Sequence, residues 1–388
     1  MPFSLIQIRD KNDLVEAIQS AQRTNKSIAL QGAGTKTKLG RHVVQDHILC
    51  LKDLTGVTLY EPEELVLSAR AATPLVEIQM LLAQNNQQLA FEPIDYASLF
   101  GQSGNSGTVA GALAINASGP RRIKAGAARD HLLGFSAVTG RGETIKSGGR
   151  VMKNVTGFDL SKLICGSYGT LAALTDITIK VTPKSETEKT IILFNHSERE
   201  CLNLLRKAAA SPHEVSGLCM VPSGAMEGFD QNLAALRLEG PEISVASRCD
   251  SLCHGLVEND IDRLLLNEKA SRLFWQKIKN FEPIIAHNGQ VWRISVAPRD
   301  GRDIIESLQS AGLPIQGYFY DWAGGLIWLA VDSAPHAYAQ IIRSILDQKG
   351  GHCTLIRADT SRRRIRSRAP SVNWWRPPTR PARVASRG

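Results

Sequence analysis

The sequence lacks the patterns that mark membrane, secreted and metal-dependent proteins. No apolar run approaches the ~20 residues that a membrane-spanning helix needs, and the amino terminus shows no basic-then-apolar signal pattern. The seven cysteines are scattered and odd in number, which argues against a disulfide framework. Cys249 and Cys253 lie near His254, but no second pair completes four ligands. We therefore expect a cytoplasmic protein with reduced thiols, no bound metal and no iron–sulfur cluster of its own.

Acidic residues and lysine are missing from the end of the chain. Residues 361–388 contain nine arginines and no acid or lysine, whereas the formal net charge of the whole chain is +9, so residues 1–360 sum to zero. The basic character therefore belongs to this tail and gives no reason to expect a nucleic-acid partner for the rest. The tail is rich in Arg, Pro and Ser without apolar periodicity, and we expect it to be disordered.

Two origins of this tail stay open. The abrupt change of composition favours an aberrant end, for instance after a frame shift. An intact mass of the native protein that includes the tail would contradict this hypothesis. The alternative is a tether for nucleic acid or an anionic membrane.

The glycine patterns of common nucleotide-binding loops are also absent. Gln31–Thr37 follows a predicted strand, but it contains neither Gly-x-x-x-x-Gly-Lys-Ser/Thr nor Gly-x-Gly-x-x-Gly. The chain instead has several runs of small residues, at Gln31–Thr37, 101–119 and Gly166–Leu171. Such a run lets the backbone approach a phosphate closely, although a packing seam or a plain turn is the alternative for any single run. Several spaced runs favour loops that close on one long ligand.

The length and the hydrophobic periodicity indicate two domains. In the first we predict helices at 10–24 and from 74, a β-hairpin over 131–147, and strands at 27–30, 48–51, 56–60, 65–71 and 171–181. After residue 189 we predict helices at 198–210, 255–279, 303–311 and 337–349 and strands at 191–194, 233–238, 290–297 and 326–331. This mixture predicts an α+β sheet with helices on one face, and we detect no internal repeat.

The motifs, taken in order, resemble a known family of flavoproteins. The chain is similar to the FAD-linked oxidases of the vanillyl-alcohol oxidase and p-cresol methylhydroxylase (PCMH) type, and among them to the smaller FAD-binding subunits of glycolate oxidases. The resemblance covers about residues 5–357. It rests on Gln31–Lys36, Gly119–Arg122, Arg129-Asp130, Val151–Leu160, Gly166–Leu171, Trp292–Ser295 and Gly350–His352.

The resemblance implies a fold and a cofactor. The expected fold is α+β, with a two-subdomain FAD-binding PCMH-type domain over residues 1–183, an α+β cap domain over 184–357 and the tail over 358–388. The expected cofactor is FAD, with its pyrophosphate held by backbone N–H groups of the loops at 31–36 and 107–111. The implied cofactor-binding residues are Gln31, Gly32, Ala33, Gly34, Thr35, Lys36, Gly107, Thr108, Val109, Ala110, Gly111, Asn116, Gly119, Arg129, Asp130 and Ile177.

The resemblance also implies a reaction and partners. We expect an oxidation of glycolate or a similar 2-hydroxy acid, with electrons passed to a larger FAD-binding catalytic subunit and an iron–sulfur subunit, and membrane association that is peripheral at most. Such chemistry needs a cation for the carboxylate and a base for the hydroxyl proton. Arg293 is the candidate cation and His352 the candidate base or orienting group, and a structural role is the alternative for each.

The chain departs from the family in two places. Larger subunits and D-2-hydroxyacid dehydrogenases of this type carry a histidine-containing metal-binding stretch, whereas Asp321–Trp328 contains no histidine. The family's carboxyl-terminal segment is also missing after Arg357. The missing histidines keep a second function open, that of a non-catalytic flavin-binding or scaffold subunit. A free-standing oxygen-using oxidase is a third interpretation.

Overall fold

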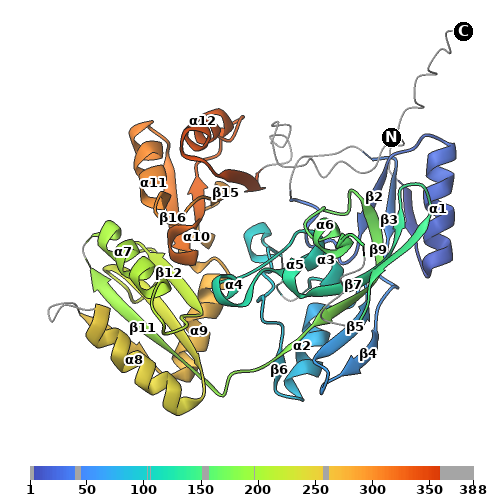
Figure 1. Ribbon diagram of the computed structural model, residues 1–388. Coiled ribbons are helices and arrows are strands. Elements are labelled where there is room, and N and C mark those ends of the chain that lie inside the picture. Colours follow the sequence, from blue (N-terminus) through green and yellow to red (C-terminus); the bar gives the residue numbers. More distant parts are fainter. Residues whose placement is uncertain are drawn as a thin grey trace, which may run out of the picture.

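Figure 1 shows a computed structural model of the chain, which describes residues 4–39, 45–102, 104, 106–150, 157–195, 197–256 and 262–358. We call residues 4–183 the N-terminal lobe, drawn in blue to green, and residues 184–358 the C-terminal lobe, drawn in yellow-green to red. Residues 151–156 of the Val151–Leu160 motif and residues 359–388 of the tail lie outside the described residues.

The N-terminal lobe contains two main sheets. The parallel sheet has the order β1 (Ser4–Gln7), β3 (His47–Cys50), β2 (Ile28–Gln31). The antiparallel sheet has the order β4 (Val57–Glu61), β5 (Val66–Arg70), β9 (Ala172–Lys180), β7 (Leu132–Thr139), β8 (Thr144–Gly148). The remaining elements are α1 (Lys11–Arg23), α2 (Leu75–Ala83), β6 (Gln87–Gln88), η1 (Ser98–Phe100), α3 (Val109–Ala114), α4 (Arg122–Ala125), α5 (Ala128–His131), α6 (Leu160–Ile164) and β10 (Thr182–Pro183).

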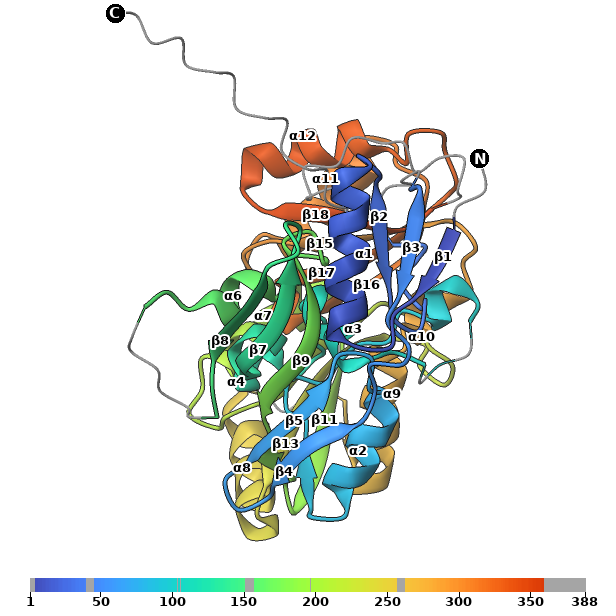
Figure 2. The same ribbon diagram turned by 90° about the vertical axis from the view of Figure 1, so that its right-hand side faces the viewer.

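Helix α1 shows how local sequence sets this lobe. The side chain of Asp10 accepts hydrogen bonds from the backbone N–H groups of Asn12 and Asp13, which caps the first turn of the helix. Its apolar stripe, with Leu14 and Ile18, is buried against side chains of both sheets. Figure 2 shows α1 lying beside the parallel sheet and next to β7 and β9. The helix therefore holds the two sheets together.

The C-terminal lobe repeats one unit of secondary structure. The first copy is β11 (Thr187–Asn195), α7 (Glu198–Ala209), β12 (Gly217–Val221), β13 (Asn232–Gly240), α8 (Glu242–Leu256), β14 (Arg263–Leu266). The second copy is β15 (Gln290–Ser295), α11 (Gly301–Ser310), β16 (Ile315–Asp321), β17 (Leu326–Val331), α12 (Ala339–Lys349), β18 (His352–Arg357), with η2 (Trp322–Gly324) between β16 and β17. Helices α9 (Glu268–Lys279) and α10 (Glu282–Ile285) connect the copies. Each copy is a ferredoxin-like βαββαβ unit.

The two copies form one antiparallel sheet. Its order is β14-β11-β13-β12-β16-β17-β15-β18, so the copies join where β12 pairs with β16. We detect no repeat in the sequence, and the structure shows that the repeat is one of element order. The prediction of a largely helical 255–279 is wrong for residues 263–266, which form β14 and pair with β11 at the edge of this sheet.

The eight-stranded sheet has a different neighbour on each face. Leu236, Trp292 and Ile327 point to the face that α7, α8, α11 and α12 cover. Leu233, Val291 and Trp328 point to the other face, where they pack with α9, α10 and the N-terminal lobe. Successive residues of a strand alternate between faces, so β15 turns Trp292 toward the helices and Val291 toward the N-terminal lobe. The predicted helix-covered face therefore exists, and the opposite face forms the contact between the lobes.

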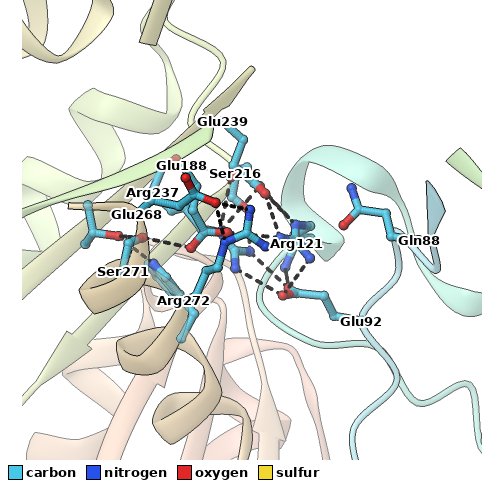
Figure 3. A network of polar contacts seen from close by, with 12 residues as sticks. Gln88, Glu92, Arg121, Glu188, Ser216, Arg237, Glu239, Glu268, Ser271 and Arg272 are labelled. Atoms are coloured by element: carbon cyan, nitrogen blue, oxygen red, sulfur yellow. Dashed lines mark hydrogen bonds and ion pairs between the residues drawn. The ribbon is translucent and has the colours of Figure 1, made fainter. Parts of the chain in front are cut away.

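A buried network of charges joins the lobes (Figure 3). The carboxylate of Glu92, from the N-terminal lobe, accepts hydrogen bonds from Arg237 of β13 at 3.0 Å and from Arg121 at 2.9 Å. Arg121 crosses the same boundary to Glu239 at 2.6 Å. Glu188 lies 3.5 Å from Arg121 and accepts a hydrogen bond from Ser271. Carboxylates and guanidiniums from both lobes therefore share one buried site.

The two arginines decide the charge state of Glu92. Burial opposes its ionisation, but the charges of Arg237 and Arg121 outweigh burial and lower the pKa of Glu92 to about 2. Arg237 is 1% exposed, so it depends on these carboxylates as well. Because a buried ion without its partner is far less stable than a buried pair, the network fixes the position of one lobe against the other.

Replacement of Glu92 by Gln tests this network. The substitution keeps the side-chain shape but leaves Arg237 short of a carboxylate, and we expect the free energy of unfolding at pH 7 to fall by about 3–5 kcal/mol. Glu92 has a pKa below its ordinary 4.5, so its contribution is complete above pH 4.5 and is lost as the pH falls toward 2. Denaturant unfolding at several pH values measures both effects.

Glu214→Gln is the matched control. Glu214 pairs with Lys124 across the same boundary, but its side chain is 65% exposed, so its loss should lower the stability far less than the loss of Glu92. Equal losses in the two variants would contradict the role given to Glu92.

Candidate functional site

Two neighbouring cavities form the candidate site. The first has a volume of about 470 Å³ and lies in the N-terminal lobe, between the loop that follows β2 and the start of α3. The second has a volume of about 430 Å³ and lies between the lobes. Leu39, Ile115 and Tyr168 line both cavities. A ligand that fills the first cavity can therefore extend into the second.

Small residues bring the two loops of the first cavity together. Thr108 caps α3 and accepts a hydrogen bond from the N–H of Gly111 at 3.2 Å. A methyl group at Gly32 would lie 3.2 Å from the Thr108 hydroxyl, so the two loops are already in close approach. Gly34 has φ +78°, a conformation that side-chain-bearing residues rarely adopt. The loop geometry therefore depends on glycine at these positions.

Lys36 places a positive charge in the first cavity. Its ammonium donates a hydrogen bond to the Thr35 hydroxyl at 3.2 Å and makes no ion pair within the described part of the chain. Methyl groups at Gly107 and Gly111 would each lie 3.7 Å from Nζ, so this cation faces the second loop. Burial lowers the pKa of Lys36, and the charge of Asp95 opposes that shift. A partly buried cation that makes no ion pair among the described residues suits an anionic ligand.

The backbone N–H groups differ between the two loops. Among the described residues, those of Gly32–Lys36 donate to no protein acceptor and are available to a phosphate. In the second loop, Val109 donates to the Thr73 carbonyl and Ala110 to the Ala71 carbonyl. Since the N–H groups of residues 109–111 donate to protein acceptors here, the expectation that 107–111 holds a pyrophosphate through its backbone stays a prediction, with less support than that for 31–36.

The predicted residues divide among three locations. Lining the first cavity are Gln31, Gly32, Ala33, Gly34, Thr35, Lys36, Thr108, Ala110 and Gly111. Lining the second are Asn116, Arg129, Arg293 and His352. Lining neither are Gly107, Val109, Gly119, Asp130 and Ile177.

Three residues of the last group have structural positions. A methyl group at Gly119 would lie 2.7 Å from the carbonyl oxygen of Glu92, so glycine allows close packing there. Asp130 accepts a hydrogen bond from the N–H of Ala127 and caps α5. Ile177 is buried in the middle of β9, which pairs with a strand on either side. These positions give them no direct contact with the cavities.

The second cavity is lined by four arginines, Arg343 of α12 and three others. Arg122 comes from α4, Arg129 from α5 and Arg293 from β15, and none of their side chains makes an ion pair or hydrogen bond within the residues that the structure describes. The Cζ atoms of Arg122 and Arg293 lie 4.2 Å and 5.2 Å from the ring centroid of Trp322. Burial lowers the pKa of Arg122, and the charges of Arg293 and Arg129 lower it further. The cavity is therefore built for an anion.

His352 occupies the rim of this cavity at the start of β18. Its side chain is exposed, yet partial burial and the charges of Arg293 and Arg122 lower the pKa of His352 below 6.5. A neutral imidazole at pH 7 can accept a proton. The structure thus brings together the two predicted catalytic candidates.

Sequence reasoning missed Arg122 and Trp322. Arg122 stands next to Arg121 in the motif that supports the family resemblance, but the doublet does not tell which arginine enters the charge network and which the cavity. Trp322 belongs to the stretch Asp321–Trp328, which the sequence analysis considered only because it contains no histidine. Its indole N–H donates to the carbonyl of Gly119 across the lobe boundary. The Arg121-Arg122 doublet was the one available signal.

Comparisons with known proteins agree with this arrangement. Residues 2–148 match the family described as "FAD binding domain". The chain is 33% identical to glycolate oxidase subunit GlcE of Escherichia coli K12, over 88% of this chain and 85% of that protein. It is 29% identical to glycolate oxidase subunit GlcD of Bacillus subtilis 168, over 50% of this chain and 39% of that protein.

The fold also resembles that of solved flavoenzymes. p-Cresol methylhydroxylase matches with a TM-score of 0.68 at 11% identity, over 92% of this chain and 81% of that one. Alkyldihydroxyacetonephosphate synthase matches with a TM-score of 0.65 at 16% identity, over 89% of this chain and 72% of that one. At these identities the likeness shows the fold alone.

Fold and sequence together define an FAD-binding protein of the PCMH type. More narrowly, the chain belongs to the family of glycolate oxidase subunit GlcE. FAD is its cofactor, and the first cavity fits that group. Lys36 and the free N–H groups of Gly32–Lys36 suit its pyrophosphate, and apolar side chains such as Leu30 and Leu174 line the same cavity.

Across the described residues, no group of three or more His, Cys, Asp or Glu side chains is arranged to hold a metal ion. No described helix is long and apolar enough to cross a membrane. All seven cysteines are free.

Replacement of Lys36 by Met tests the first cavity. Because a charge-assisted contact to a phosphate is lost, we expect the dissociation constant of FAD to rise by about 10- to 100-fold. The FAD-free protein should be as stable as the wild type or more stable, since a buried cation is removed. Flavin fluorescence titration and denaturant unfolding measure the two effects. Lys38→Met is the control, since Lys38 is exposed, and unchanged FAD affinity in Lys36→Met would refute the assignment.

Proposed function

We propose that this chain is the FAD-binding subunit of a complex that oxidises glycolate or a similar small 2-hydroxy acid to the 2-oxo acid. The main support is the second cavity, where arginines without ion-pair partners in the described structure adjoin the cavity that fits FAD. The relatives named glycolate oxidase subunits support the same substrate class. Small 2-hydroxy acids are carboxylates at neutral pH, and the cavity offers them cations.

The residues of the second cavity divide the work. Arg293 binds the carboxylate and orients the acid. His352, with its lowered pKa, accepts the hydroxyl proton at a ring nitrogen. Bound FAD supplies the acceptor for the hydride that leaves C2. Two electrons and two protons thus leave the substrate, which becomes the 2-oxo acid.

The same proposal includes the assembly and its location. Electrons pass from this chain to a larger FAD-binding subunit and an iron–sulfur subunit in the cytoplasm, with peripheral membrane contact at most. Within the chain, residues 1–183 form the FAD-binding domain and 184–357 the cap domain, which agrees with the division of sheets between the lobes.

A second function is a subunit that binds FAD without turning over substrate. The observation that favours it is the stretch Asp321–Trp328, which contains no histidine where catalytic relatives of this type carry metal-binding histidines. In that case the partner subunit carries out the chemical step.

An anaerobic absorbance spectrum separates the two functions. If the FAD-loaded chain is catalytic, adding glycolate alone should bleach the flavin band, because the substrate's electrons reach FAD within this chain. Flavin that stays oxidised with glycolate, but is reduced when the partner subunits are added, would establish the second function. The free FAD released by denaturation gives the flavin content for normalisation.

Replacement of His352 by Gln tests the proton acceptor. We expect the rate constant of flavin reduction to fall by about 10²- to 10⁴-fold with unchanged flavin content. Because the pKa of His352 is lowered from its ordinary value, the wild-type rate should level off toward neutral and alkaline pH and fall as acid protonates the imidazole. His254→Gln, at an exposed position of α8, is the control. An unchanged pH profile in His352→Gln would exclude this histidine as the base.

A further inference from the structure

Two arginines from opposite lobes face one tryptophan ring. Arg122 lies in α4 of the N-terminal lobe and Arg293 in β15 of the C-terminal lobe, with Cζ atoms 4.2 Å and 5.2 Å from the centroid of the Trp322 ring. The indole N–H of Trp322 donates to the Gly119 carbonyl, and its backbone N–H donates to Asp321. The ring is thereby fixed to both lobes, and both guanidiniums lie within cation–π distance of it.

The charges of this pair are unbalanced. Within the described ranges neither arginine makes an ion pair, and the charge of Arg293 lowers the pKa of Arg122, which is the sign of repulsion between them. Asp347 also lines the cavity and has an interaction of its own. By contrast, the buried Arg121 and Arg237 are fully engaged with Glu92 and Glu239. An anion placed between Arg122 and Arg293 would remove their repulsion.

We infer that Arg122 and Arg293 together bind one carboxylate, a guanidinium from each lobe, with Trp322 as their common support. The inference rests on the proposed function and assigns Arg122 as a second substrate-binding residue. Guanidiniums suit this task because their planar N–H groups match the two oxygens of a carboxylate. The ligand class is a small monocarboxylate, such as the acid group of a 2-hydroxy acid.

The bound carboxylate also acts across the lobe boundary. Its charge offsets the repulsion between two cations that belong to different lobes, so binding should strengthen the contact between the lobes. Removal of a structural arginine lowers the stability of the protein, whereas removal of Arg122 should not. The ligand-free Arg122→Gln protein should be as stable as the wild type or more stable, because a like-charge contact is gone, whereas stabilisation by carboxylate should be lost.

A double-mutant cycle on the full-length, FAD-loaded chain tests the shared ligand. The probe is methoxyacetate, a monocarboxylate that lacks the oxidisable hydroxyl, followed by its perturbation of the flavin absorbance. We expect Arg122→Gln and Arg293→Gln each to raise its dissociation constant by about 10- to 100-fold. The dissociation constant of the double variant should exceed that of the weaker-binding single variant by less than about threefold, because both residues hold the same carboxylate. Losses that multiply would overturn the inference.

Three controls separate loss of charge from loss of structure. Methoxyacetamide, the neutral counterpart of the probe, should bind wild type and variants alike, and an equal loss for it would contradict a charge-specific contact. Arg122→Lys should recover part of the affinity. Arg299→Gln removes an arginine whose side chain is 83% exposed and should change nothing.

The experiment distinguishes this inference from the proposed function. If the variants lose methoxyacetate as expected but glycolate never reduces the wild-type flavin, carboxylate binding by the pair stands and catalysis by this chain fails. If glycolate reduces the flavin but the variants bind methoxyacetate normally, catalysis by this chain stands, and the inference that Arg122 and Arg293 share one carboxylate is wrong. Absence of any methoxyacetate binding to the wild type would also overturn the pair.

Discussion

The ion pairs of Glu92 with Arg121 and Arg237 are the interaction on which the rest of the site depends. Glu92 and Arg121 belong to one lobe and Arg237 to the other, and all three are largely withdrawn from water. Since a buried charge tolerates little displacement from its partner, the network sets the distance between the lobes. The hydrogen bond from the indole N–H of Trp322 to the Gly119 carbonyl crosses the same boundary and depends on that distance. The second cavity thus has walls from both lobes at fixed separation.

Neighbouring arginines in the sequence serve opposite purposes. Arg121 is satisfied by carboxylates and contributes to the stability of the folded chain, whereas Arg122 is left beside another cation. Such an arrangement lowers stability unless something anionic binds, and groups of this kind concentrate at functional sites. Lys36 in the first cavity is likewise a cation without an ion pair in the described structure, and burial lowers its pKa. In the described structure the charges of Glu92, Arg121 and Arg237 are paired, whereas Lys36, Arg122 and Arg293 make no ion pair.

Local rules predicted much of the fold but not the pairing of the C-terminal sheet. The cap and stripe of α1 and the hairpin of β7 and β8 could be predicted because they depend on residues close in sequence. The strands β12 and β16 were missed, and β14 was assigned to a helix because a leucine-rich segment suits either structure. Their conformation is decided by partners in the sheet, and those partners lie far away in the sequence. For the same reason Arg293 and His352 could be proposed singly, while the meeting of Arg122 with Trp322 could not.

The small-residue loops show where such reasoning reaches its limit. A run of Gly, Ala and Ser indicates that something approaches the backbone closely, but it does not say whether that is a ligand or the protein. In this structure the backbone of one loop is open to a ligand, and the backbone of the other is in contact with the protein itself. Residues 32–36 keep their N–H groups free of protein acceptors in the described structure, beside the ammonium of Lys36, whereas Val109 and Ala110 donate to Thr73 and Ala71. The second loop therefore places small residues against Lys36, and we propose that the positive charge and the free donors for the cofactor come from the first loop.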